Sequence, residues 1–168
     1  MKFLLLTLLT IALYASDYKS QFKALTNAQM LNAEFIYTKA LPHDLELTMV
    51  SIAHKESKLG EWSINLSDPS CGMFHNLLTS VATRESIRPN QWNLSRICDR
   101  LIQDKQYAFD NALQELLYWR HYWSTRTTTR LWSHMVGSYN GGFKPNFTYA
   151  TDVLSRVRTL EKMIKETE

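Results

Sequence analysis

Apolar residues recur three and four positions apart along most of this chain, and this spacing constrains its fold more than any other feature. It is clearest in the last predicted helix, where Tyr149, Val153, Val157, Leu160 and Ile164 fall on one face. Side chains at such steps lie above one another on a helix, whereas a strand would alternate them between two faces. The same analysis predicts helices over residues 17–40, 42–59, 76–87, 94–103, 107–123 and 130–139.

Turn-forming residues separate these segments. Pro42 suits the first turn of a helix, and Gly60 suits its end. Between residues 61 and 75, asparagine, serine, aspartate, proline and glycine are dense enough to predict an ordered loop with a small hairpin. We therefore expect one all-α domain over residues 16–168, with a short loop or hairpin insertion after the helix that ends near Gly60.

The first residues resemble a secretory signal. Lys2 precedes an apolar run, Phe3 to Ala15, that is too short to span a bilayer comfortably. Cleavage after Ala15 would leave Leu13 where a small residue is preferred, so an uncleaved anchor is the alternative. We expect a signal peptide over residues 1–15 and an exported domain after it.

The charge of the chain favours one class of partner over another. The net charge is only +3, and the densest basic group, Arg120 to Arg130, is interrupted by aromatic residues and threonines. Nucleic acids are bound by continuous basic stripes, so we do not expect them as partners. A slightly basic surface favours an anionic polymer outside the cytoplasm.

Cys71 and Cys98 both lie in the part predicted to be exported. An even number of cysteines in an oxidising compartment permits one disulfide, which would join the loop to a later helix. The sequence cannot show that two cysteines are close together, so two unpaired thiols are the alternative.

Glu56 interrupts the apolar stripe of one predicted helix. Leu45, Met49, Ile52 and Leu59 surround it at helical spacing, so its carboxyl should point the same way as these side chains. Burial disfavours the charged form of a carboxylate, and a carboxyl in such a setting can donate a proton near neutral pH. Glu56 is therefore a candidate general acid. The plainer alternative is a structural glutamate with satisfied hydrogen bonds.

Two further segments accompany Glu56-Ser57, namely the turn Ser70-Cys-Gly-Met-Phe-His75 and the downstream Ser138-Tyr-Asn-Gly-Gly142. Together they resemble the lytic transglycosylases of bacterial cell walls. The lysozyme-like domain of that family carries Glu-Ser, then a Gly-Leu-Met-Gln or Gly-Leu-Phe-Gln turn, then Ala-Tyr-Asn-Gly-Gly. The resemblance covers roughly residues 41 to 142 in matching order and spacing. It is greatest for small, single-domain members that accompany secretion machines.

The resemblance implies a role for each matching residue. Glu56 would be the only catalytic acid and base, and Tyr139 would orient its carboxyl or form a hydrogen bond to it. The substrate-binding residues would be Met73, Phe74, His75 and Asn140, and the structural residues near the site would be Ser57, Asn65, Ser70, Gly72 and Gly141. Taken alone, Tyr139-Asn-Gly-Gly is also a common helix end, and Met73 and Phe74 are common core residues.

The family cleaves the bond between N-acetylmuramic acid (MurNAc) and N-acetylglucosamine (GlcNAc) in peptidoglycan. A protonated carboxyl protonates the glycosidic oxygen so that it can leave. The carboxylate then helps the muramic acid 6-hydroxyl attack its own anomeric carbon, which gives a 1,6-anhydro sugar. A second carboxylate is unnecessary, and Asp68, the nearest acid in the loop, precedes a proline and suits a turn.

His75 departs from the family pattern, which usually has glutamine at this position. A neutral imidazole donates and accepts hydrogen bonds as an amide does, but it also gains charge near pH 6.5, roughly. We therefore expect His75 to contact the glycan and to make activity sensitive to mild acid.

The sequence has no histidine pair at metal-binding spacing, so we expect neither a metal nor an organic cofactor. The expected partners are peptidoglycan strands and, from the resemblance, a secretion or envelope-spanning machine. We expect a monomer in the bacterial periplasm, associated with the membrane if the signal stays uncleaved. Two other functions remain open: a hydrolytic muramidase on the same fold, and a non-catalytic peptidoglycan-binding or assembly protein.

Overall fold

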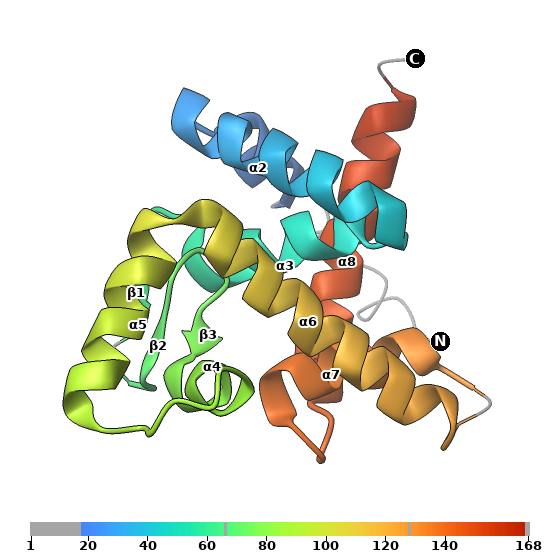
Figure 1. The fold of residues 1–168 in the computed structure, drawn as a ribbon. Coiled ribbons are helices and arrows are strands. Elements are labelled where there is room, and N and C mark those ends of the chain that lie inside the picture. The colour runs from blue at the N-terminus through green and yellow to red at the C-terminus, as the bar shows by residue number, and fades with distance from the viewer. Residues whose placement is uncertain (1–17, 66, 128, 167–168) are drawn as a thin grey trace.

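The computed structural model describes residues 18–65, 67–127 and 129–166, which form the expected all-α fold with one small sheet (Figure 1). The predicted signal peptide lies outside the described residues. Within the described part of the chain, no helix is long and apolar enough to cross a membrane. The helices are α2 (Asn27–Ala40), η1 (Leu41–His43, 3-10), α3 (Glu46–Ser57), α4 (Leu78–Arg84), α5 (Gln91–Gln103), α6 (Lys105–Ser124), α7 (Leu131–Gly141) and α8 (Phe147–Lys165), and residues 18–23 form a further helical segment before α2.

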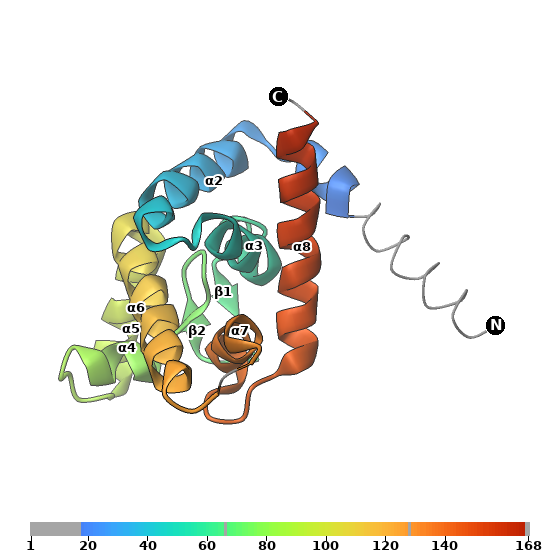
Figure 2. The same ribbon diagram turned by 90° about the vertical axis from the view of Figure 1, so that its right-hand side faces the viewer.

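Helix α3 lies at the centre of the molecule, with α2 packed on one side and α8 on the other (Figure 2). Its apolar residues Met49 and Ile52 are fully buried, as the helical spacing predicts. On α8, Val153 and Val157 face the same core, and α8 packs in turn against α7, which contacts α6. Helices α3 and α8 therefore share one core, and Glu56 is in the last turn of α3.

Helix α3 begins at Glu46 rather than at Pro42. Pro42 lies in η1, which ends at Asp44 with a φ of +55°. A residue in this left-handed conformation cannot continue a right-handed helix, so α3 has to start again after it. The proline therefore starts a separate 3-10 turn.

Helix α3 also ends earlier than Gly60 suggests. Lys58 and Leu59 have φ values of +50° and +60°, and both are left-handed. The Lys58 N–H donates to the carbonyl of His54 and the Leu59 N–H to that of Ala53, so these carbonyls of the last turn are satisfied. The chain therefore reverses direction directly after Glu56 and Ser57.

The predicted hairpin region holds an antiparallel sheet of three two-residue strands, in the order β1 (Ile64–Asn65), β2 (Ser70–Cys71) and β3 (Asn76–Leu77). Ile64 pairs with Cys71, and Ser70 pairs with Leu77. Strand β3 takes two residues from the predicted helix 76–87, so α4 starts only at Leu78. The sheet, α4 and α5 lie together on one side of the molecule (Figure 1).

A disulfide joins Cys71 of β2 to Cys98 of α5, with 5.3 Å between their Cα atoms. Of the two alternatives that the sequence leaves open, a disulfide or two unpaired thiols, the structure has the disulfide. At the next residue, Gly72, φ is +79° and a Cβ would lie 2.7 Å from the carbonyl oxygen of Leu101. Only glycine tolerates this conformation and this close approach, so the sheet can rest directly on α5.

Candidate active site

The carboxyl of Glu56 is held from two sides. Its Oε1 accepts a hydrogen bond of 2.5 Å from the Tyr149 hydroxyl on the first turn of α8. Its Oε2 lies 3.4 Å from Nδ1 of His75, and the side chain is 17% exposed. The side chain is therefore mostly shielded from solvent.

Tyr149 is positioned by the start of α8. The Oδ1 atom of Asn146 caps this helix by accepting from the Tyr149 N–H at 3.0 Å, while its Nδ2 donates to Oδ1 of Asn140 at 2.8 Å. A Cβ on Gly141 would lie 2.9 Å from the Asn146 nitrogen, so glycine allows this close approach. Asn140 and Gly141 therefore act on Glu56 through the cap of α8. Asn140 is also exposed, so its predicted substrate role stays a prediction.

Of the two roles that the resemblance implies for Tyr139, orienting the carboxyl of Glu56 or forming a hydrogen bond to it, the described contacts of its hydroxyl do not include the second. Its hydroxyl donates to the carbonyl oxygen of Phe74 at 2.9 Å, one residue before His75. Burial, followed by the negative charge of Glu56, raises the pKa of the Tyr139 phenol well above its ordinary value. The same two causes raise the pKa of Tyr149. Both phenols stay protonated, and Tyr139 can support the site through the turn that carries His75.

The sequence does not predict a site role for Tyr149. It predicts this residue only as one member of the apolar stripe of α8, and Tyr149 is indeed buried in the core. Its hydroxyl reaches Glu56 across 93 positions of sequence, which helical spacing cannot indicate. The one available signal is its place three residues after Asn146, where a helix N-cap positions the first turn.

The side chains of Met73 and Phe74 do not line a cleft, which corrects their predicted role as glycan contacts. Phe74 is fully buried, and its ring lies edge-on to Phe109 with 6.2 Å between centroids. Met73 is 7% exposed and belongs to the same core. The turn directs both side chains inward because its backbone carbonyls are held by Ser57 and Tyr139.

His75 lies between the loop and Glu56, with a left-handed φ of +45°. Its Nε2 is 2.7 Å from the Trp62 carbonyl oxygen, which can only accept, so Nε2 carries a proton. Neutral His75 therefore presents an unprotonated Nδ1 to Oε2 of Glu56. When His75 is protonated, Nδ1 carries a hydrogen that can be donated to Oε2 of Glu56.

The pKa of His75 reflects this contact. Burial would lower it, but the hydrogen bond to Glu56, the Trp62 carbonyl and the Glu56 charge together raise it above its ordinary value. His75 therefore holds its proton to higher pH than a free imidazole. The prediction that His75 contacts the glycan stays open, since the described contact is with the acid.

Ser57, Asn65 and Ser70 have supporting contacts in the loop. The Ser57 hydroxyl donates to the Met73 carbonyl oxygen at 2.6 Å and accepts from the Gly60 N–H at 2.8 Å. Asn65 Oδ1 accepts from the Ser67 N–H at 3.1 Å, a local turn, and Ser70 is buried in β2. The supporting role near an active site that the resemblance implies for these three residues stays a prediction.

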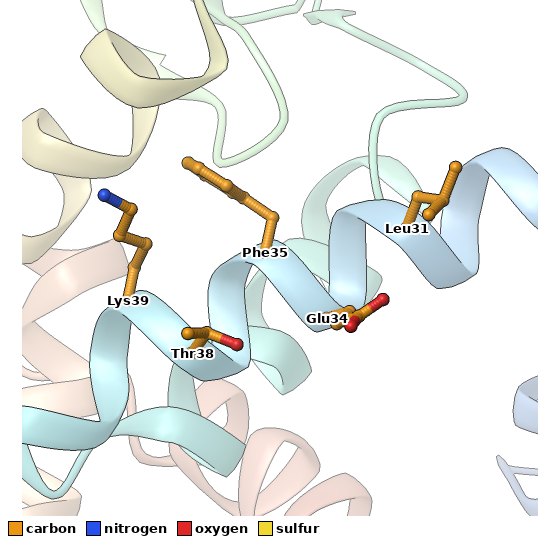
Figure 3. Close-up of a pocket in the computed structure, with 5 residues that line it drawn as sticks. All are labelled: Leu31, Glu34, Phe35, Thr38 and Lys39. Atoms are coloured by element: carbon orange, nitrogen blue, oxygen red, sulfur yellow. The ribbon is translucent and has the colours of Figure 1, made fainter.

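An exposed tryptophan lies beside this site, and a hollow on α2 lies apart from it. Trp62, which holds His75 through its carbonyl, is 54% exposed and has the Lys58 ammonium 4.1 Å from its ring centroid. A hollow on α2 is lined by Leu31, Glu34, Phe35, Thr38 and Lys39 (Figure 3). These residues all belong to α2, and the Phe35 ring packs against Phe109 of α6. The hollow is therefore separate from Glu56.

Comparisons with models of protein families, with curated proteins and with solved structures find no match. Among the described residues, no group of three or more histidines, cysteines, aspartates or glutamates is arranged to hold a metal ion. At the site itself, Glu56, Tyr149 and His75 are the ionisable side chains that meet.

Proposed function

We propose that this protein is a peptidoglycan lytic transglycosylase of the lysozyme-like type, with Glu56 as its acid and base. The observation that carries the proposal is the single carboxyl of Glu56, held by a neutral tyrosine on one oxygen and facing His75 with the other. Its position in a central helix, followed by a small sheet, agrees with the resemblance of the three sequence segments.

The two carboxyl oxygens suit different tasks in this reaction. Oε1 is bound by the Tyr149 hydroxyl, so Oε2 is the oxygen that can carry the mobile proton. That proton would pass to the glycosidic oxygen as the bond from MurNAc C1 breaks. The carboxylate left behind is stabilised by the Tyr149 hydroxyl. It then takes the proton of the MurNAc 6-hydroxyl while O6 bonds to C1, so no water is consumed.

His75 supplies the proton balance of this cycle. The Trp62 carbonyl keeps Nε2 protonated, so Nδ1 can accept the proton of Oε2 or return it. Protonated His75 can return its proton to Oε2, so His75 would serve as the proton reserve from which the acid form of Glu56 is restored. Glutamine, the residue usual in the family, could bond to the carboxyl but could not hold this proton.

The disulfide supports an exported protein. Such bonds persist in oxidising compartments and are rare in a reducing cytoplasm, so the bond between Cys71 and Cys98 agrees with the predicted signal peptide. We propose a periplasmic location and peptidoglycan strands as the substrate. A secretion or envelope-spanning machine remains the proposed partner.

The test is mass spectrometry of the muropeptides that purified residues 16–168 release from peptidoglycan. We expect products ending in 1,6-anhydro-MurNAc from the wild type and none from Glu56→Gln, a substitution of nearly equal shape. Asp68→Asn is the matched control, because Asp68 is exposed in the adjacent loop, and it should keep wild-type turnover.

Other products would select one of the alternatives. Reducing MurNAc ends would show hydrolysis and make the protein a muramidase. Binding of peptidoglycan without any release, with Glu56→Gln behaving as the wild type, would make it a binding or assembly protein.

A further inference from the structure

A network of polar residues lies behind Glu56, where α3, α8 and the helical segment 18–23 meet. Asp152 of α8 is its centre: it accepts hydrogen bonds from the Tyr18 hydroxyl and from Lys55, and Arg156 lies 3.6 Å away. Burial alone would raise the pKa of Asp152, but the bonds from Lys55 and Tyr18 lower it. Asp152 is therefore a charged group whose described polar contacts are one hydroxyl donor and two cations.

The segment 18–23 contributes two aromatic rings to this network. The guanidinium of Arg156 lies 4.2 Å from the ring centroid of Tyr18 and donates to Nδ1 of His54. The Phe22 ring is 4.4 Å from the ring of His54, and both Tyr18 and Phe22 are buried. The segment is thus packed into the interior beside α3 and α8.

The network reaches the carboxyl of Glu56 by two short routes. Asp152 follows Tyr149 by three residues, so one turn of α8 connects the Tyr18 contact to the tyrosine that holds Glu56. Lys55 immediately precedes Glu56, and its ammonium is 5.1 Å from the ring centroid of Tyr149. A cation beside a general acid favours the ionised form of that acid, and Asp152 pairs with this cation.

We infer that the segment 18–23 is a positioning element for the acid, with Tyr18 and Asp152 as positioning residues. Tyr18 fixes Asp152, and Asp152 fixes both Lys55 and the first turns of α8 that carry Tyr149. The inference rests on the proposed function, because it assigns these residues to the same reaction at Glu56.

The test compares Tyr18→Phe and Asp152→Asn in the full mature chain, with kcat and KM measured on soluble glycan strands. Tyr18→Phe keeps the ring beneath Arg156 and removes only the hydroxyl. We expect its kcat to fall by about five-fold, the effect of one ordinary hydrogen bond, with KM unchanged. Asp152→Asn should lower kcat further. The double variant Tyr18→Phe, Asp152→Asn should be no slower than Asp152→Asn alone, because Tyr18 acts through Asp152.

Two control variants separate positioning from general stability. Tyr37→Phe removes a hydroxyl from an exposed tyrosine of α2, and Tyr118→Phe removes one from an exposed tyrosine of α6. Both should keep the wild-type kcat. Equal rates for Tyr18→Phe and Tyr37→Phe, or additive losses in the double variant, would overturn the inference.

Amide hydrogen exchange gives a readout that does not depend on turnover. If Tyr18 positions α8, Tyr18→Phe should raise exchange over residues 147–156, and Tyr37→Phe should not. An absence of product from the wild type would refute the proposed function. The exchange result would still decide the positioning role, because unchanged exchange in Tyr18→Phe would refute that role.

Discussion

The hydroxyl of Tyr149 donates to Oε1 of Glu56 at 2.5 Å, and this bond joins the first turn of α8 to the last turn of α3. It leaves Oε2 facing His75. A buried phenol that stays neutral can stabilise the carboxylate without adding a charge of its own. In the proposed reaction, this bond would stabilise the carboxylate that remains after Glu56 has given up its proton.

Replacing Tyr149 by phenylalanine should lower kcat by about 10- to 100-fold, since it removes a hydrogen bond to a charged group worth about 1.5–3 kcal/mol. KM should change little, because the hydroxyl contacts the acid and no substrate group. Turnover of soluble glycan strands measures both constants. Tyr139→Phe is the comparison, because its hydroxyl bonds to the Phe74 carbonyl. A larger loss of kcat in Tyr139→Phe than in Tyr149→Phe would reverse the two roles.

Replacing His75 by glutamine should change the pH profile. Because the pKa of His75 is raised, His75 loses its proton only as the pH rises above the ordinary pKa of imidazole. Wild-type activity should therefore fall on the alkaline side of about pH 6.5, which differs from the acid sensitivity suggested by the sequence alone. In His75→Gln this alkaline loss of activity should disappear or shift to another pH. Rates of peptidoglycan clearance between pH 5 and 9 measure the two profiles. Superimposable profiles of the wild type and His75→Gln would show that His75 does not supply the proton.

His54 should make the folded state sensitive to acid. Burial, then the charges of Arg156 and Lys58, lower the pKa of His54 to about 4. An unfolded histidine titrates near 6.5, so the unfolded chain binds more protons between about pH 6.5 and 4. The stability contribution is complete above this window and is lost as the pH falls through it, by roughly 3 kcal/mol.

Urea unfolding of the wild type and His54→Gln at pH 7 and pH 4.5 tests this linkage. The wild type should lose more free energy of unfolding than the variant between the two pH values. His121→Gln is the control, since His121 is exposed on α6. Equal losses in the wild type and His54→Gln would mean that His54 is not the titrating group.

Removing the disulfide should destabilise the fold and disturb the turn that follows it. The bond spans a sequence separation of 27, for which chain entropy predicts about 3–4 kcal/mol. The double variant Cys71→Ala, Cys98→Ala should lose about this much free energy of unfolding, and reductant should weaken the wild type to the same extent. Reductant should have no effect on the variant. A variant as stable as the oxidised wild type would contradict the estimate.

The helices of this fold follow from local spacing, and so does the burial of Met49, Ile52 and Val153. Helix starts were less predictable. Pro42 is compatible with the first turn of an α-helix or of a 3-10 turn, and only the left-handed Asp44 decides between them. That conformation depends on how the chain has to turn before α3.

Within the candidate site, the sequence identifies Glu56 and His75 by residue type and neighbours. It cannot indicate that Tyr149 holds the acid, because a tyrosine in an apolar stripe is fully explained by packing. Nor can the sequence show which side of a tight turn faces the core. The predicted glycan contact of Phe74 is therefore replaced in the structure by a ring contact with Phe109. The contacts of Tyr149 and of Phe74 both join segments that are distant in sequence.

The hydroxyl of Ser57 has a consequence for how this site can move. It is the neighbour of Glu56, yet it bonds to the carbonyl of Met73 in the turn that carries His75. With the Gly60 N–H on the same oxygen, both ends of the loop are clamped to the helix. Opening of this loop would break both hydrogen bonds of the Ser57 hydroxyl, so in the proposed reaction a glycan strand would bind against the closed loop.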